Sequence, residues 1–114
     1  MTQVTIYHNP RCSKSRQTLA LLEDRGIQPM IVEYLKDPIP QEKILQLLAM
    51  MNLSPRQLIR TKEVEYKEQS LADATDQQLI TAMAATPKLI ERPIVEANGK
   101  AAIGRPPEQV LEIL

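Results

Sequence analysis

Residues 4–16 read VTIYHNPRCSKSR, and both the fold and the chemistry of the chain depend on this stretch. It contains the only cysteine of the chain, Cys12, and its only histidine, His8. A short strand-like run opens the stretch, and leucines at helical spacing follow it. The pattern predicts a strand over about residues 3–7, a loop that carries Cys12, and a helix over about residues 14–25.

Cys12 is therefore expected at the N-terminal end of a helix, where unpaired N–H groups and the helix dipole favour a thiolate. Three basic side chains act in the same direction: Arg11, Lys14 and Arg16. Ser15, one helical turn on, could donate its hydroxyl to the thiolate, and His8 adds positive charge only when it is protonated. A buried structural cysteine would have apolar neighbours instead. We predict a reactive, partly exposed nucleophile.

The composition restricts the class of protein. The 114 residues include 14 basic and 14 acidic side chains, so no net charge attracts nucleic acid or an anionic membrane. One cysteine excludes an internal disulfide and, with one histidine, provides no zinc set, so we predict no metal and a reducing, cytoplasmic setting. No apolar run approaches the roughly 18 residues that span a bilayer, and the start resembles no signal peptide. We expect one domain over residues 1–114 and a monomer by default.

The middle of the chain predicts helices. A second strand over residues 30–35 completes a βαβ unit with parallel strands. Apolar spacing predicts a helix after Pro40. Capping boxes predict a short helix after Ser54, to about Arg60, and another helix after Thr75. Residues 61–74 are the least certain.

The last third of the chain changes character. Asn98 and Gly99 separate two short strand-like runs, which is the strongest sequence pattern for a hairpin. Prolines after Arg105 predict a final helix. The fold class is therefore predicted to be α/β. The order of elements is that of a thioredoxin-like fold, whose mixed four-stranded sheet has a helical insertion between the βαβ unit and the C-terminal ββα unit.

Four segments resemble the arsenate reductases that use glutathione and glutaredoxin. In order along the chain they are residues 8–16, HNPRCSKSR; 58–60, LIR; 91–95, ERPIV; and 104–108, GRPPE. The resemblance implies a thioredoxin-like fold in which Cys12 attacks arsenate or a related oxyanion. It also implies three arginines that bind the oxyanion: Arg60, Arg92 and Arg105. His8, Ser15 and Arg16 would tune the thiolate or order its loop, and Pro93 would follow a cis peptide bond.

The resemblance is to the shorter branch of the family, because the well-known arsenic-resistance members have a longer C-terminal tail. Those members also have smaller, uncharged residues in place of Arg11, Ser13 and Lys14. No bound cofactor is expected. With only one cysteine the chain has no resolving thiol of its own, so glutathione would be a co-substrate and glutaredoxin a partner.

Neighbouring thiol enzymes fit less well. The phosphatase-like arsenate reductases need a C-x5-R loop, but this chain has Thr18, and a dithiol oxidoreductase needs C-x-x-C, but this chain has Ser15. Two alternatives stay open. One is a monothiol glutaredoxin-like reductase of mixed disulfides, for which the three arginines would matter little. The other is a non-catalytic, redox-sensitive regulator that binds RNA polymerase. The loop and the three arginines together favour the reductase, although each arginine alone is typical of a solvated surface.

Overall fold

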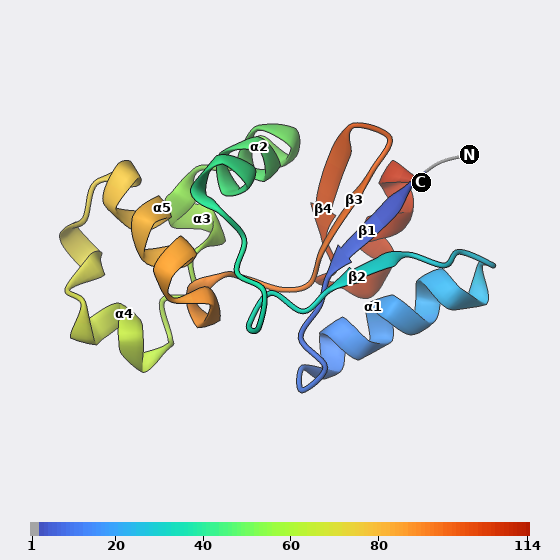
Figure 1. The fold of residues 1–114 in the computed structure, drawn as a ribbon, viewed down its shortest axis with the longest axis horizontal. Coiled ribbons are helices and arrows are strands. Elements are labelled where there is room, and N and C mark those ends of the chain that lie inside the picture. The colour runs from blue at the N-terminus through green and yellow to red at the C-terminus, as the bar shows by residue number, and fades with distance from the viewer. Residues whose placement is uncertain (1–2) are drawn as a thin grey trace. The chain divides into compact units, whose positions relative to one another are not determined.

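The computed structural model describes residues 3–114, which form two compact units (Figure 1). A sheet unit combines the chain up to Asp37 with Arg92–Leu114, and a helical unit spans Pro38–Glu91. The prediction of one domain over residues 1–114 stays a prediction. Within the described residues, no helix is both long enough and apolar enough to cross a membrane.

The sheet unit contains four strands in the order β2-β1-β3-β4. They are β1 (Val4–Tyr7), β2 (Met30–Val32), β3 (Ile94–Ala97) and β4 (Lys100–Ile103). β1 pairs with β2 in parallel, whereas β1 with β3 and β3 with β4 are antiparallel. The predicted fold class, a thioredoxin-like mixed sheet with a helical insertion after the βαβ unit, is confirmed.

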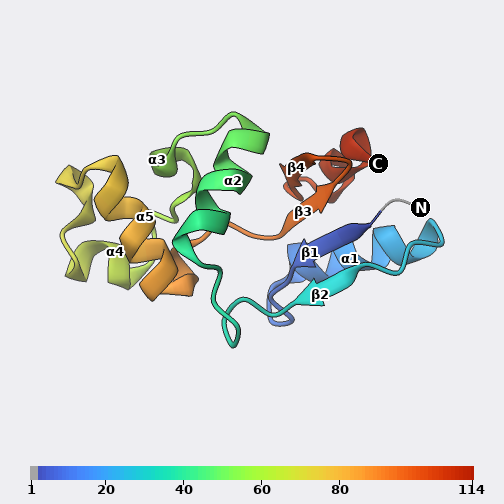
Figure 2. The same ribbon diagram turned by 45° about the horizontal axis from the view of Figure 1, so that its top comes forward.

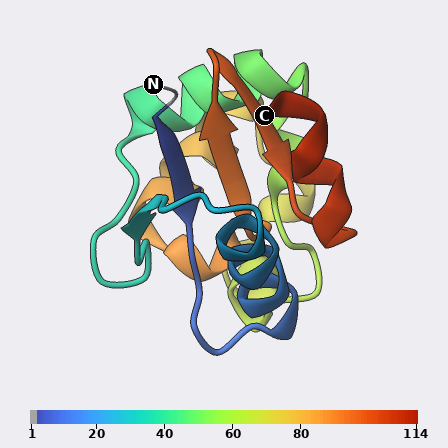
Figure 3. The same cartoon turned by 90° about the vertical axis from the view of Figure 1, so that its right-hand side faces the viewer.

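One face of the sheet is covered by helix α1 (Ser13–Asp24) and by the 3-10 segment η3 (Pro107–Ile113), which lies beside β4 (Figure 3). The core between them consists of buried apolar residues: Val4, Ile6, Leu22, Val95, Ala97, Val110 and Ile113. Alternate residues of each strand face this core, because side chains point to opposite faces of a strand. The sheet therefore holds α1, and with it the Cys12 loop, in a defined place.

The β3–β4 hairpin turns at Asn98 and Gly99, as predicted. Both residues have positive φ, 56° and 72°, the backbone conformation that a two-residue turn of this hand requires. Ladder pairing continues past the strands, since Gly104 N donates to Pro93 O at 2.9 Å. The peptide bond before Pro93 is cis, as the resemblance implied, and so is the bond before Pro106.

The helical unit gathers four α-helices and two 3-10 turns (Figure 2). They are α2 (Gln41–Met51), α3 (Pro55–Leu58), α4 (Val64–Glu68), η1 (Leu71–Asp73), α5 (Asp76–Ala85) and η2 (Pro87–Leu89). The capping boxes predicted at Ser54 and Thr75 are both present, each with its glutamine three residues on. The uncertain residues 61–74 contain α4 and η1.

Two predicted boundaries were wrong. β2 ends at Val32 instead of residue 35, because Lys36 N and Asp37 N both donate to Glu33 O and turn the chain. α3 ends at Leu58, because the next residues pair as strands with the segment around Ile90. The final element, predicted as a helix, is a 3-10 helix over Pro107–Ile113.

Candidate active site

The strand directions bring three distant segments to one end of the sheet. β1 runs antiparallel to β3 with Tyr7 opposite Ile94, so the loop after β1 lies where β3 begins. β3 in turn pairs with β4, with Ile94 opposite Ile103, so the residues after β4 reach the same end. The Cys12 loop, Arg92 and Arg105 therefore meet, although Cys12 and Arg105 are 93 positions apart.

Cys12 is the N-cap residue of α1, as predicted, and its carbonyl accepts a hydrogen bond from Arg16 N at 3.0 Å. Its sulfur lies 3.7 Å from Arg105 Nη2. The residue is only 8% exposed, so the prediction of a partly exposed nucleophile was wrong. Part of the reason is tertiary, because a guanidinium from the far end of the chain contacts the sulfur. A cation in contact with the sulfur stabilises the negative charge of a thiolate.

Arg105 is held by two contacts. Its Nε donates to the carbonyl oxygen of Arg92 at 2.8 Å, and its Nη2 donates to Cys12 Sγ. Such a fork of donors suits the paired recognition of a tetrahedral oxyanion. Arg92 itself is half-buried beside this contact. The structure thus brings the guanidinium of one predicted anion-binding arginine, Arg105, to the predicted nucleophile, together with the backbone carbonyl of a second, Arg92.

The loop before Cys12 is ordered by a residue that the sequence analysis did not single out. Asn9 O accepts from Cys12 N at 3.0 Å, and its side-chain Oδ1 accepts from Arg11 N at 3.0 Å. Arg16, predicted to order the loop, donates from Nη1 to Pro10 O at 2.9 Å. Asparagine followed by proline is a common start of a turn, so the Asn9 role was readable in principle.

His8 and Ser15 contact each other, with 2.6 Å between His8 Nδ1 and Ser15 Oγ. Both side chains are buried, and the serine oxygen also accepts from Asn9 N at 3.0 Å. Ser15 was expected to donate to the Cys12 thiolate. The structure instead gives its hydroxyl these two partners, because the loop folds back over the first turn of α1.

The protonation state of His8 follows from its surroundings. Burial lowers the pKa of His8, Arg16 lowers it further, and Glu33 acts in the opposite direction. The imidazole is therefore neutral at pH 7, and its Nδ1 shares a hydrogen bond with the Ser15 hydroxyl. His8 thus orders the loop and supplies no positive charge to Cys12 at neutral pH.

We expect the free energy of unfolding to fall as the pH drops below about 6.5. The pKa of His8 is lower in the folded chain than the value of 6.5 for an unfolded one, so below that pH the unfolded chain binds a proton that the folded chain resists. This contribution is fully present above pH 6.5 and is lost as the pH falls through the folded pKa. Urea unfolding between about pH 7.5 and pH 5.5 measures it.

His8→Asn provides the control for this prediction. His8 is the only histidine, so the variant removes all histidine-linked pH dependence while asparagine keeps a polar partner for Ser15. The variant should show a flatter dependence between about pH 7.5 and pH 5.5. Equal slopes for both proteins would mean that the ring titrates alike in the folded and unfolded chain.

Arg60, the third predicted anion-binding arginine, belongs to the helical unit. Its Nη1 forms an ion pair with Glu63, and its Nε lies 3.7 Å from Glu91 Oε1. The side chains of Arg60 and Glu63 are each 22% exposed. Two carboxylates therefore already neutralise this guanidinium within its own unit.

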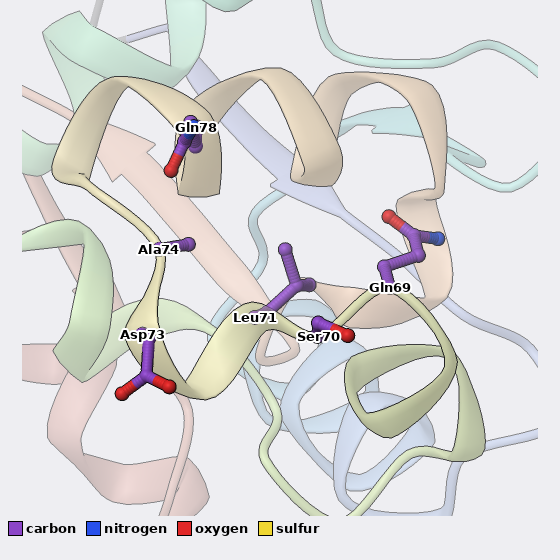
Figure 4. Close-up of a pocket in the computed structure, with 6 residues that line it drawn as sticks. All are labelled: Gln69, Ser70, Leu71, Asp73, Ala74 and Gln78. Atoms are coloured by element: carbon purple, nitrogen blue, oxygen red, sulfur yellow. The ribbon is translucent and has the colours of Figure 1, made fainter.

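A hollow of about 320 Å³ in the helical unit is a poor match for an oxyanion (Figure 4). It lies beside η1 and the start of α5, and its lining residues are Gln69, Ser70, Leu71, Asp73, Ala74 and Gln78. None of these side chains is cationic, and the one carboxylate would repel an anion. Among residues 3–114, no group of three or more histidine, cysteine or acidic residues is placed to hold a metal ion.

Comparisons with known proteins show which proteins this chain is similar to. A model of the ArsC family matches residues 7–113. The chain is 56% identical to the Escherichia coli uncharacterized protein YfgD, over 98% of this chain and 97% of that protein. It is 48% identical to an arsenate reductase of Haemophilus influenzae, over 97% and 98%. A solved structure of an arsenate reductase from Vibrio cholerae is 52% identical and superposes with a TM-score of 0.95, covering 99% of this chain and 98% of that one.

Proposed function

The chain belongs to the ArsC family, and on this premise we propose that it reduces arsenate to arsenite, with Cys12 as the nucleophile. The observation that carries the proposal is the contact between the only cysteine and a guanidinium, 3.7 Å from Arg105 Nη2 to Cys12 Sγ. Relatives named arsenate reductases support the choice of substrate. Glutathione is the proposed co-substrate and glutaredoxin the proposed partner.

The proposed reaction begins with attack of the Cys12 thiolate on arsenic. An S–As bond forms, and one arsenate oxygen leaves as water after taking up protons. Arg105 and Arg92 would hold the remaining oxygens, since paired guanidinium donors match a tetrahedral oxyanion. The adduct still contains As(V), so two electrons are needed to reach As(III).

External thiols would supply those electrons, because the chain has no second cysteine. In the proposed sequence the glutathione thiol then forms a second S–As bond, and a second arsenate oxygen leaves as water with the thiol proton. A glutaredoxin thiol attacks the glutathione sulfur. The S–As bond to glutathione breaks, its electron pair reduces arsenic, and a glutathione–glutaredoxin disulfide forms. Water then displaces Cys12 from arsenic and releases arsenite. Such a cycle requires a reducing compartment, which keeps the cytoplasm as the proposed location.

The test is arsenate-dependent NADPH oxidation coupled through glutathione, glutathione reductase and glutaredoxin. Turnover that requires glutathione and glutaredoxin, and that thioredoxin with its reductase does not replace, is the expected result. Turnover with thioredoxin alone would leave arsenate reduction intact and overturn the choice of thiol donor. An absence of arsenate turnover, with reduction of a glutathione mixed disulfide by the same protein, would favour the monothiol reductase instead.

Removing the charge of Glu63 tests whether Arg60 binds the oxyanion. Because Glu63 competes for the Arg60 guanidinium, Glu63→Gln should lower the KM for arsenate by about threefold, the scale of a partly exposed ion pair. Steady-state kinetics measure it, with Glu68→Gln, an exposed carboxylate at the end of α4, as the matched control. An unchanged KM for Glu63→Gln would remove Arg60 from the proposed anion site.

A further inference from the structure

Gly104 stands between β4 and Arg105 at a point of close contact. A Cβ atom at this position would overlap Thr18 Oγ1, and it would lie 2.9 Å from Pro93 Cγ and 3.1 Å from Thr18 Cγ2. The φ of Gly104 is not in the positive range where glycine is favoured, unlike those of Gly26 and Gly99. Glycine is therefore required at residue 104 by packing and not by backbone conformation.

The atoms that surround Gly104 have little freedom to move away. Thr18 is 0% exposed, and its hydroxyl donates to Lys14 O at 2.8 Å inside α1, which holds the rotamer. On the other side, Gly104 N is tied to Pro93 O in the β3–β4 ladder. The end of β4 is thus held between the proline before β3 and the same helix that carries Cys12.

We propose that Gly104 and Thr18 are positioning residues, whose direct contact sets the distance between the Arg105 guanidinium and the Cys12 sulfur. Arg105 is the next residue after Gly104 and spans from Arg92 O to Cys12 Sγ. Cys12 and Thr18 lie at the start and in the second turn of one helix. A shift of β4 away from α1 therefore lengthens the contact of Arg105 with sulfur.

The expected displacement of residue 104 is large compared with the tolerance of the contact between Arg105 and Cys12. A carbon atom at residue 104 packs without overlap only when its neighbours are about 3.5 Å away. Gly104→Ala should therefore move the chain by a sizeable fraction of an ångström and separate Arg105 from Cys12. Displacement of a reacting group by about 1 Å costs on the order of 10²-fold in rate, so we expect kcat/KM to fall on that scale.

The test compares two alkylating agents on Cys12. Iodoacetate carries a carboxylate and iodoacetamide is neutral, so the ratio of their rate constants reports the positive charge beside the sulfur. Arg105→Gln should lower this ratio by about threefold to fivefold, the scale of a surface charge pair. Gly104→Ala keeps the arginine and should lower the ratio as far as Arg105→Gln does.

Two double variants provide the matched control. Gly104→Ala with Thr18→Ala removes both overlapping threonine atoms and opens space on the α1 side. A small movement of the new methyl group into that space also relieves its 2.9 Å approach to Pro93 Cγ, so the ratio should return to within about twofold of wild type. Gly104→Ala with Thr18→Ser keeps Oγ1 and should stay low. The ratio of each double variant is compared with that of the corresponding single variant, Thr18→Ala or Thr18→Ser. Thermal unfolding tests whether every variant is folded.

Several outcomes would overturn the inference. They are a wild-type ratio in Gly104→Ala, equal ratios in the two double variants, or a Thr18→Ala double variant that does not fold. If Gly104→Ala alone does not fold, the difference in alkylation ratio between the two double variants tests the inference. The inference rests on the proposed function in taking Cys12 as the reacting atom, but alkylation needs no arsenate. A wild-type protein without arsenate turnover would refute the proposed reductase activity. The ratio of the two alkylation rate constants would still test whether Gly104 and Thr18 position Arg105.

Discussion

Cys12→Ser is expected to lower arsenate-dependent turnover by on the order of 10⁴-fold or more, to the background of the coupled assay. A serine hydroxyl is not ionised at neutral pH and is a much weaker nucleophile toward arsenic than a thiolate. Since Cys12 is the only cysteine, no other thiol of the chain can replace it. NADPH oxidation with glutathione and glutaredoxin in excess measures the loss.

The control for this variant is Ser13→Ala, an exposed change at the adjacent residue, which should keep turnover within about twofold. Serine is close in size to cysteine, so the thermal midpoint of Cys12→Ser should stay near that of wild type. Turnover retained in a folded Cys12→Ser protein would refute the assignment of the nucleophile.

Arg105→Ala should lower kcat/KM for arsenate by about 10- to 10²-fold, the scale of one lost hydrogen bond to a charged group. Most of the loss should appear in KM, because the side chain is proposed to capture the anion next to Cys12. Arg105→Lys should recover only a small part. A lysine has one nitrogen, which cannot reach both Arg92 O and Cys12 Sγ as the guanidinium does.

The matched control is Arg25→Ala, which removes an exposed arginine at the C-terminal end of α1 and should leave kcat/KM within about twofold. Steady-state kinetics over a range of arsenate concentrations separate KM from kcat. If Arg105→Lys matched wild type, only the charge at this position would matter, and the fork of donors would not be needed.

Local features of the sequence determined most of the secondary structure. The Asn98-Gly99 turn and the capping boxes at Ser54 and Thr75 were predicted because each depends on a few neighbouring residues and their backbone preferences. Element ends that depend on distant partners were predicted poorly. α3 stops at Leu58 because Ile59 pairs with Ile90, and no local pattern reveals that pairing.

The candidate site also has features that the sequence predicted and features that it did not. The sequence alone identified the candidate nucleophile, because the chain has one cysteine, and it placed that cysteine at the start of a helix. It did not reveal that Ser15 bonds to His8 or that His8 is buried and neutral. Both depend on how the loop folds back, since burial of an ionisable ring is a property of its surroundings.

Only the tertiary structure decided which arginines accompany Cys12 within the sheet unit. Arg105 reaches the sulfur because β1, β3 and β4 are paired in one register, and shifting a strand by one residue would turn its side chains to the other face. The close contact of Gly104 with Thr18 likewise joins segments that are far apart in sequence. The sequence by itself therefore determined the elements and the thiol, whereas strand register and helix packing decided what surrounds the thiol.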